Sequence, residues 1–113
     1  ANPSSMELAI QAFSQRFPTG WVIVGDMKEL GDASQEAHLQ IIKSLLEKRF
    51  NRIFLVGPAF GSASMVIQTP DRRLQHYPSI EELKAAWNWT TCEGQSLLLK
   101  GSRSMHLEKL LES

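Results

Sequence analysis

Three short apolar runs in this chain each end at a turn of small or polar residues. The runs with their turns are WVIVGDMKELG at 21–31, IFLVGPAFGSA at 53–63 and LLLKGSRSM at 97–105. A continuous apolar run of this length is typical of a parallel strand that is buried on both faces. Ligands of open α/β sheets collect at the carboxyl ends of such strands. The three turns are therefore predicted to be parts of one site.

Helical patterns alternate with these runs. Apolar residues at helical spacing predict a helix over about 5–17, with a capping box formed by Ser4 and Glu7. Asp32 and Gln35 form the same kind of pair and predict the start of a second helix, whose apolar stripe continues to Phe50. Both predicted helices precede an apolar run, so they alternate with strands.

The second half of the chain is predicted in the same way. Ser79 and Glu82 indicate the start of a short helix, and Ser102 or Ser104 the start of a closing one. Residues 58–77 allow either a pair of short strands or a mobile loop. The order of elements predicts the α/β class: a three-layer, Rossmann-like domain with a mostly parallel sheet and helices on both faces.

Length and charge limit the classes of function. With 113 residues the chain is predicted to be a single domain, spanning 1–113. Its 12 acidic and 12 basic side chains give a formal net charge of zero, so neither nucleic acid nor a membrane is expected as a partner. The start at Ala1, without an initiator Met or a secretory signal, suggests a piece excised from a longer chain.

Cysteine and histidine usage argues against a metal centre. Cys92 is the only cysteine, which excludes an internal disulfide and a cysteine-rich metal site. The three histidines include no pair at metal-ligand spacing. His38 is kept as a candidate ligand or proton donor, although a lone helical histidine is more often a packing residue. No metal ligands are predicted in this chain.

The first turn concentrates charge at a strand end. Asp26, Lys28 and Glu29 place two carboxylates and one amine within a few positions. Such a group can hold a metal, orient an amine or contact phosphate. A solvated loop with its acids near a helix N-terminus is the commoner meaning of this composition, and the residues alone leave these alternatives open.

The last turn has an anion-binding composition. Lys100, Ser102, Arg103 and Ser104 offer two cations and two hydroxyls beside the predicted helix start, an arrangement suited to carboxylate or phosphate. An ordinary capped helix with exposed basic residues explains the same residues equally well. The G-x-x-x-x-G-K-[ST] pattern of a Walker P-loop does not occur in the sequence.

Taken together, three motifs in order resemble the C-terminal domain of the Mur ligase family. They are Asn2-Pro3-x-Ser5-Met6, then G-D-M-x-E-L-G at 25–31 followed by His38, and K-G-S-R-S at 100–104. The similarity is to members that join D-alanyl-D-alanine to UDP-MurNAc-tripeptide in peptidoglycan precursor synthesis. It implies a cytoplasmic, ATP-dependent amide ligase acting through an acyl phosphate. It also implies two further domains, one for the UDP-sugar and a central ATPase domain.

The resemblance also implies roles for residues. Asn2, Pro3 and Ser5 correspond to the tail of a nucleotide-binding motif at the hinge between domains. Arg103 or Lys100 is expected to pair with the carboxylate of D-alanyl-D-alanine.

Further roles follow from the same resemblance. Ser102, Ser104 and the helix N-terminus are expected to donate hydrogen bonds to substrate, Asp26 or Glu29 to hold the attacking ammonium, and Lys28 to lie at the substrate side.

No complete catalytic set is expected in this chain alone, which is predicted inactive in isolation. ATP and Mg²⁺ belong to the parent enzyme, and neither is expected to be tightly bound here. Two alternatives stay open: another Mur or folylpolyglutamate-type ligase domain, and a non-catalytic Rossmann-like binding module.

Overall fold

The three apolar runs form neighbouring parallel strands. The computed structural model describes residues 1–68 and 70–112. Its strands are β1 (Trp21–Gly25), β2 (Arg52–Val56), β3 (Leu74–Tyr77) and β4 (Leu97–Lys100). They form one sheet in the order β3-β2-β1-β4, and every pairing between these described strands is parallel. The predicted α/β class is confirmed.

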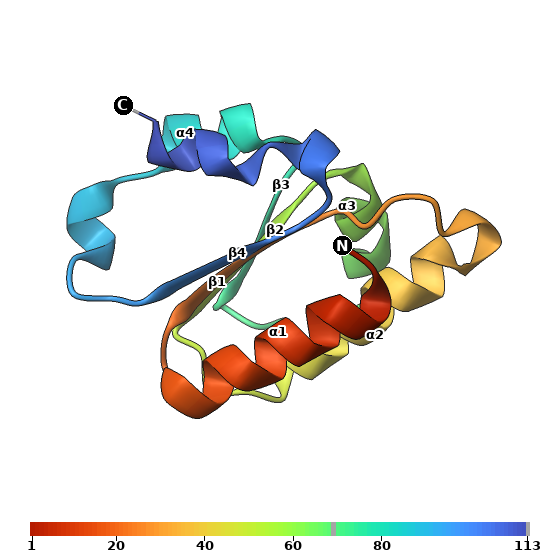
Figure 1. Ribbon diagram of the computed structural model, residues 1–113, viewed down its shortest axis with the longest axis horizontal. Coiled ribbons are helices and arrows are strands. Elements are labelled where there is room, and N and C mark those ends of the chain that lie inside the picture. The colour runs from red at the N-terminus through yellow and green to blue at the C-terminus, as the bar shows by residue number, and fades with distance from the viewer. Residues whose placement is uncertain (69, 113) are drawn as a thin grey trace.

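Helices cover both faces of this sheet (Figure 1). One face packs against α1 (Pro3–Arg16), α2 (Ser34–Leu46) and α3 (Pro58–Ser64). The other packs against α4 (Ile80–Ala86) and the 3-10 helices η2 (Trp89–Cys92), η3 (Arg103–Met105) and η4 (Leu107–Leu111). A further 3-10 helix, η1 (Gly31–Ala33), leads into α2. The predicted three layers are therefore present.

Alternation along the strands explains why both faces are apolar. Val22 and Val24 belong to the core beneath α1 and α2, whereas Trp21 and Ile23 belong to the core on the α4 side. Successive side chains of a strand point to opposite faces, so a strand buried on both sides needs an uninterrupted apolar run. The central position of β1, between β2 and β4, meets that requirement.

Helix starts agree with the sequence in one case and differ in three. Ser79 caps α4 as predicted, its hydroxyl accepting from the Glu82 N–H. The cap of α1 is Asn2 rather than Ser4: its side chain accepts from the Ser5 N–H at 2.8 Å. The helix begins at Pro3 because proline, which has no N–H to satisfy, is well suited to the first helical position. Asn2 therefore occupies the N-cap position.

The predicted pair of Asp32 and Gln35 does not cap α2. Asp32 lies inside η1, and the N-cap residue, Ala33, makes no side-chain capping bond. The helix also ends at Leu46, before the predicted stripe is complete. Here a short 3-10 turn takes the place of a side-chain cap, as is common at helix ends.

Two regions differ from prediction. Residues 58–77 contain helix α3 as well as strand β3, in place of two strands or a loop, with Thr69 outside the described residues. The closing helix is two 3-10 helices separated by His106, whose backbone is left-handed at φ 51°. Neither Ser102 nor Ser104 makes a capping bond in this region. Leu107 and Leu110 are buried at a spacing of three, which matches the 3-10 period.

None of the described helices combines the length and apolarity needed to cross a membrane.

Candidate functional site

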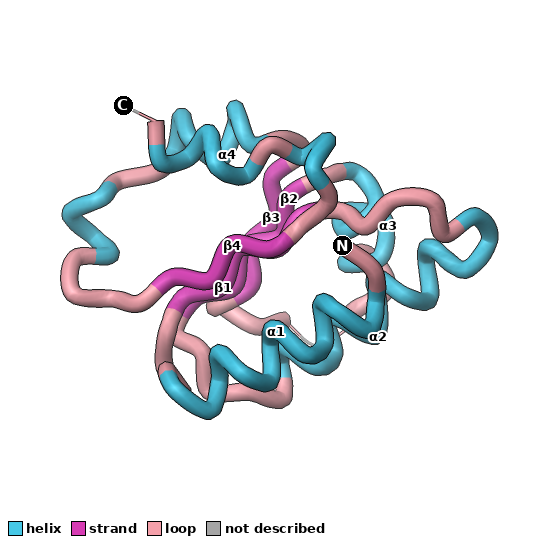
Figure 2. Tube along the Cα trace, viewed as in Figure 1, coloured by secondary structure: helices cyan, strands magenta, loops and turns pink. Residues whose placement is uncertain are grey.

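The turns after β1, β2 and β4 are joined by backbone hydrogen bonds. The Asp26 N–H donates to the Val56 carbonyl at 3.0 Å, and the Ser102 N–H donates to the Asp26 carbonyl at 3.1 Å. The Gly57 N–H donates to the Tyr77 carbonyl of β3 at 2.9 Å. These bonds continue the sheet ladder past the strand ends, which lie together at one edge in Figure 2. The structure thus brings the three predicted turns together.

Two glycines let two segments of the chain approach each other closely at this edge. A Cβ at Gly101 would lie 2.9 Å from the Gly25 Cα atom. A Cβ at Gly25 would lie 3.1 Å from the Met105 Cβ and 3.2 Å from the Leu107 Cδ2. The glycines of the first and last turns therefore allow the segment after β4 to fold over the end of β1.

Asp26 is committed to the start of α3. Its side chain is 1% exposed. One carboxylate oxygen accepts from the Ala59 N–H at 2.8 Å, and the other accepts from the Phe60 N–H at 2.9 Å. The carboxylate thus satisfies two backbone donors that a helix start leaves unpaired. Its assignment to the attacking ammonium stays a prediction that would need this buried arrangement to open.

His38, in α2, is joined to the first turn by a buried hydrogen bond. Its Nδ1 lies 2.7 Å from the Ser34 carbonyl and its Nε2 lies 3.0 Å from the Met27 N. A carbonyl only accepts, so Nδ1 carries the proton and Nε2 accepts from the Met27 N–H. The ring is fully buried and meets Phe60 edge-on at 4.6 Å between centroids. His38 therefore supports the turn from the core.

Four charged side chains of the first and last turns are exposed or half-buried. Lys28 and Glu29 are exposed on the first turn, and Glu29 has a left-handed backbone at φ 61°. Lys100 is half-buried and Arg103 exposed. Among residues 1–68 and 70–112, neither cation of the last turn has a side-chain hydrogen bond or ion pair. Two uncompensated cations at one strand end suit an anionic ligand.

The hydroxyls of the last turn lie close together. The Oγ atoms of Ser102 and Ser104 are 3.1 Å apart. The helix start expected beside them is the short 3-10 helix η3, with Ser102 at its N-cap position. Its role as a source of backbone hydrogen-bond donors stays a prediction.

The residues predicted for nucleotide binding serve the start of α1. The Ser5 hydroxyl donates to the Asn2 carbonyl at 3.1 Å, and the Asn2 N–H donates to the Ser5 Oγ at 3.2 Å. Pro3 occupies the first helical position. Their role toward nucleotide remains a prediction.

Sequence reasoning missed the part played by the middle turn. Its residues Ala59 and Phe60 bind Asp26, and the Gly57 carbonyl accepts from the His76 Nε2 at 2.7 Å. One local signal was available, because proline is favoured at the first position of a helix and Pro58 follows a glycine. The partners themselves lie more than 15 residues apart along the chain, beyond the reach of local patterns.

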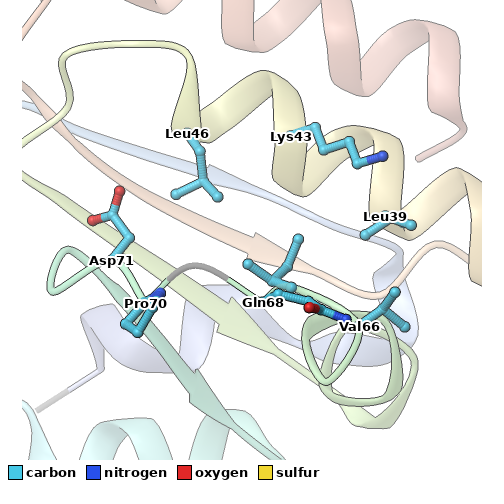
Figure 3. A pocket seen from close by; sticks show the side chains of 8 residues that line it. Leu39, Lys43, Leu46, Val66, Gln68, Pro70 and Asp71 are labelled. Atoms are coloured by element: carbon cyan, nitrogen blue, oxygen red, sulfur yellow. The ribbon is translucent and has the colours of Figure 1, made fainter.

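Three other features stand apart from this edge. Burial raises the pKa of the Cys92 thiol, which keeps it protonated and unreactive. Among the described residues, no group of three or more His, Cys, Asp or Glu side chains is placed to hold a metal ion. A groove between α2 and residues 66–68 and 70–71, lined among others by Leu46 on one side and Pro70 on the other (Figure 3), contains none of the predicted site residues.

Comparison with known proteins gives consistent matches. Residues 1–103 match the family described as "Mur ligase, glutamate ligase domain". A UDP-N-acetylmuramoyl-tripeptide--D-alanyl-D-alanine ligase of Treponema pallidum is 31% identical over 97% of this chain and 25% of its own length. The enzyme of that name from Bacillus subtilis is 28% identical over 99% of this chain and 25% of its own.

A solved structure agrees. The crystal structure of MurF from Acinetobacter baumannii superposes with a TM-score of 0.81 at 30% identity, covering 98% of this chain and 24% of that one. The chain therefore spans about a quarter of the length of the curated relatives it matches.

Proposed function

Because this chain belongs to the family described as "Mur ligase, glutamate ligase domain", we propose that it is the C-terminal domain of a three-domain ligase that adds D-alanyl-D-alanine to UDP-MurNAc-tripeptide. The relatives aligned with nearly the whole chain carry that activity in their names. The observation that supports this role most is that two cations beside the joined strand ends, Lys100 and Arg103, have no side-chain hydrogen bond or ion pair with the residues that the structure describes.

The proposed reaction has two steps. The terminal carboxylate of the tripeptide attacks the γ-phosphorus of ATP, so that an acyl phosphate forms and ADP leaves. The amine of D-alanyl-D-alanine then attacks the acyl carbon. A C–N bond forms, the bond from that carbon to the phosphate oxygen breaks, inorganic phosphate departs, and the amine nitrogen loses a proton. Because the proposed reaction uses ATP and a UDP-linked precursor, we assign it to the cytoplasm.

In this proposal the chain supplies the acceptor side of the site. Arg103 pairs with the carboxylate of the dipeptide, because a planar guanidinium suits two-point recognition of a carboxylate. Lys100 adds positive charge, while Ser102 and Ser104 donate hydrogen bonds. Closure of the domain excludes water from the acyl phosphate.

The first turn supplies the remaining side chains of that acceptor side. Glu29 is the better candidate for the ammonium, because Asp26 is buried and already accepts two hydrogen bonds. Lys28 lies exposed between them on the same turn and faces the substrate side in this proposal.

The start of α1 fits the proposed hinge. A short turn connects this helix to β1, and the two elements run in opposite directions, so the N-terminus of the chain lies on the side of the strand carboxyl ends (Figure 1). A domain placed before Asn2 would therefore adjoin the acceptor turns, with Asn2, Pro3 and Ser5 at the junction. ATP and Mg²⁺ are assigned to the central domain of the parent.

The parent ligase tests this function with a panel of amines. Purified full-length enzyme, given ATP and UDP-MurNAc-tripeptide, is expected to release ADP in proportion to added D-alanyl-D-alanine. Glutamate and single amino acids serve as comparison amines. Preference for glutamate would favour a folylpolyglutamate-type or neighbouring Mur ligase, whereas no amine-dependent ADP release would favour a binding module.

A further inference from the structure

A pocket lined by aromatic side chains lies at the amino ends of the strands, on the α4 side of the sheet. This aromatic pocket has a volume of about 310 Å³, at the small end of the range for ligand sites. Its aromatic lining comes from Trp21, Phe54, Tyr77 and Trp87. Trp21 is the first residue of β1, and the candidate site lies beyond the last, about 13 Å away at about 3.3 Å per residue. The aromatic pocket is therefore separate from that site.

Three of the rings pack closely in its wall. The centroids of Trp21 and Trp87 are 5.8 Å apart with an interplanar angle of 86°, and those of Phe54 and Trp87 are 5.2 Å apart at 65°. Edge-to-face contacts of this kind are a preferred arrangement of aromatic pairs. Trp21 and Phe54 are buried, whereas Trp87 is half-buried. The wall is thus a fixed apolar surface that a flat ring can pack against.

An arginine lies beside this wall. The Arg52 Cζ atom is 5.9 Å from the centroid of the Trp21 ring, within the range of a cation–π contact. Arg52 is exposed and also lines the aromatic pocket. It forms no ion pair with any residue that the structure describes. Its charge is therefore held next to the aromatic surface and is available to a ligand.

The charged side chains around this end of the sheet are positive. A second, neighbouring pocket shares Trp21 and Arg52 with the first and adds Arg72 and Arg73. Arg73 is committed to Asp71 and to backbone carbonyls, whereas Arg72 is exposed. Within the described part of the chain, no Asp or Glu lines either pocket. Because the whole chain has a formal net charge of zero, this cationic lining is a local feature that favours an anion.

One donor in the wall lacks an acceptor. The Nε1 atom of Trp87 is buried and has no hydrogen-bond partner among the described residues. Indole N–H groups usually find a partner when buried, and an unpaired buried donor costs free energy. A ligand that carries an acceptor would satisfy this donor after a rotation of the half-buried ring toward the pocket.

We propose that the aromatic pocket binds a planar aromatic anion. The ring of the ligand packs against Trp21 and Trp87. Its carboxylate or phosphate pairs with Arg52, because a planar guanidinium suits two-point recognition of such groups. The small volume limits the ring system to about two fused rings. Aromatic carboxylates and nucleoside monophosphates share this chemistry, and the proposal does not depend on the ligase function.

NMR titration of the 113-residue chain tests the proposal, with the indole N–H signals of its three tryptophans as the readout. Added 2-naphthoate is expected to shift the Trp21 and Trp87 signals in a saturable way. The neutral 2-naphthamide has the same ring but no charge, so its Kd should be higher by at least about fivefold.

Substitution of Arg52 tests the charged contact. Arg52→Gln should raise the Kd for 2-naphthoate by at least about fivefold. Arg16→Gln is the matched control, because Arg16 is also exposed and its Cζ atom lies 5.3 Å from the Phe17 ring centroid, away from the pocket. It should leave the Kd within about twofold of the wild-type value.

Adenosine monophosphate and inorganic phosphate, titrated in the same way, distinguish the two sources of the anion. Saturable binding of the nucleotide supports a nucleoside monophosphate as ligand, whereas binding of 2-naphthoate alone supports an aromatic carboxylate. The absence of saturable shifts with both aromatic anions would overturn the proposal. Equal Kd values for wild type and Arg52→Gln would also overturn it, as would inorganic phosphate binding as tightly as either aromatic anion. None of these results bears on the ligase function.

Discussion

The carboxylate of Asp26 fills the space that a side chain at Gly57 would need. A Cβ at Gly57 would lie 2.4 Å from the Asp26 Cγ and 2.5 Å from each of its oxygens. Gly57 also has φ 120°, a backbone conformation that other residues rarely adopt. The end of β2 and the side chain after β1 are therefore fitted to each other, which holds the first and middle turns in register.

Gly57→Ala is expected to destabilise the chain by more than about 3 kcal/mol, because it combines backbone strain with loss of the Asp26 arrangement. Urea unfolding measures this. Gly94→Ala is the matched control: Gly94 has φ 81° but nothing within 4 Å of a built Cβ. It should cost only the strain, about 1 to 2 kcal/mol. Equal losses in the two variants would show that Asp26 does not occupy this space.

Asp26→Asn tests the carboxylate itself. The amide oxygen can accept from only one side, so either the Ala59 or the Phe60 N–H loses its acceptor. We expect a loss of about 1 to 3 kcal/mol in the free energy of unfolding. Asp32→Asn, at an exposed acid in η1, should change the same quantity by less than about 0.5 kcal/mol. A loss at Asp26 no larger than this control would refute its role at the start of α3.

His38 is expected to tolerate only a side chain that still accepts from Met27. His38→Gln can place its amide oxygen near the position of Nε2, whereas His38→Leu leaves the buried Met27 N–H without its acceptor. The leucine variant should be less stable than the glutamine variant by about 1 to 2 kcal/mol. Thermal and urea unfolding compare the two directly. A more stable leucine variant would mean that packing, not the hydrogen bond, determines this position.

The pair of Asp71 and Arg73 predicts a pH dependence. Arg73 donates two side-chain hydrogen bonds to Asp71, at 3.1 Å and 3.0 Å, and this bonding lowers the pKa of the Asp71 carboxyl from its ordinary value of 3.8. The stabilisation is thus present above pH 3.8 and is lost as the pH falls through the lowered value. Both side chains are about one quarter exposed, so we expect less than about 1 kcal/mol.

Asp71→Asn tests that dependence. The difference in unfolding free energy between this variant and the wild type should be largest near neutral pH and should shrink below pH 3.8. Unfolding by urea at several pH values measures it. A difference that stays constant across this range would contradict an ionic contribution from Asp71.

How much of this molecule the sequence predicts depends on the range of the interaction. Strands β1, β2 and β4 follow from continuous apolar runs, and the Ser79 cap from a spacing of three residues. For residues 58–77, which contain β3, the sequence left short strands and a loop as alternatives, because the exposed Gln75 and His76 interrupt the apolar pattern at an edge of the sheet. The closing segment carries a helical apolar pattern, but the left-handed backbone at His106 divides it.

The same contrast between local and long-range interactions applies to the candidate site. The composition of the charged turns identified them as candidate binding segments, and the parallel strands explain why those turns meet. The burial of Asp26 could not be predicted, because its partners lie 33 and 34 residues away in a helix that the sequence did not reveal. The path of the chain after β4 could not be predicted either, because it depends on the packing of Met105 and Leu107 against Gly25.

Steady-state kinetics of Arg103→Ala in the full-length ligase test the central claim most directly, that this domain binds the acceptor dipeptide through its last turn. Arg49→Ala, at an exposed arginine after α2, is the control. We expect Arg103→Ala to raise the KM for D-alanyl-D-alanine by about tenfold or more, as for loss of a charge-assisted hydrogen bond, and to leave the KM for ATP nearly unchanged. Unchanged dipeptide kinetics in this variant would contradict the account.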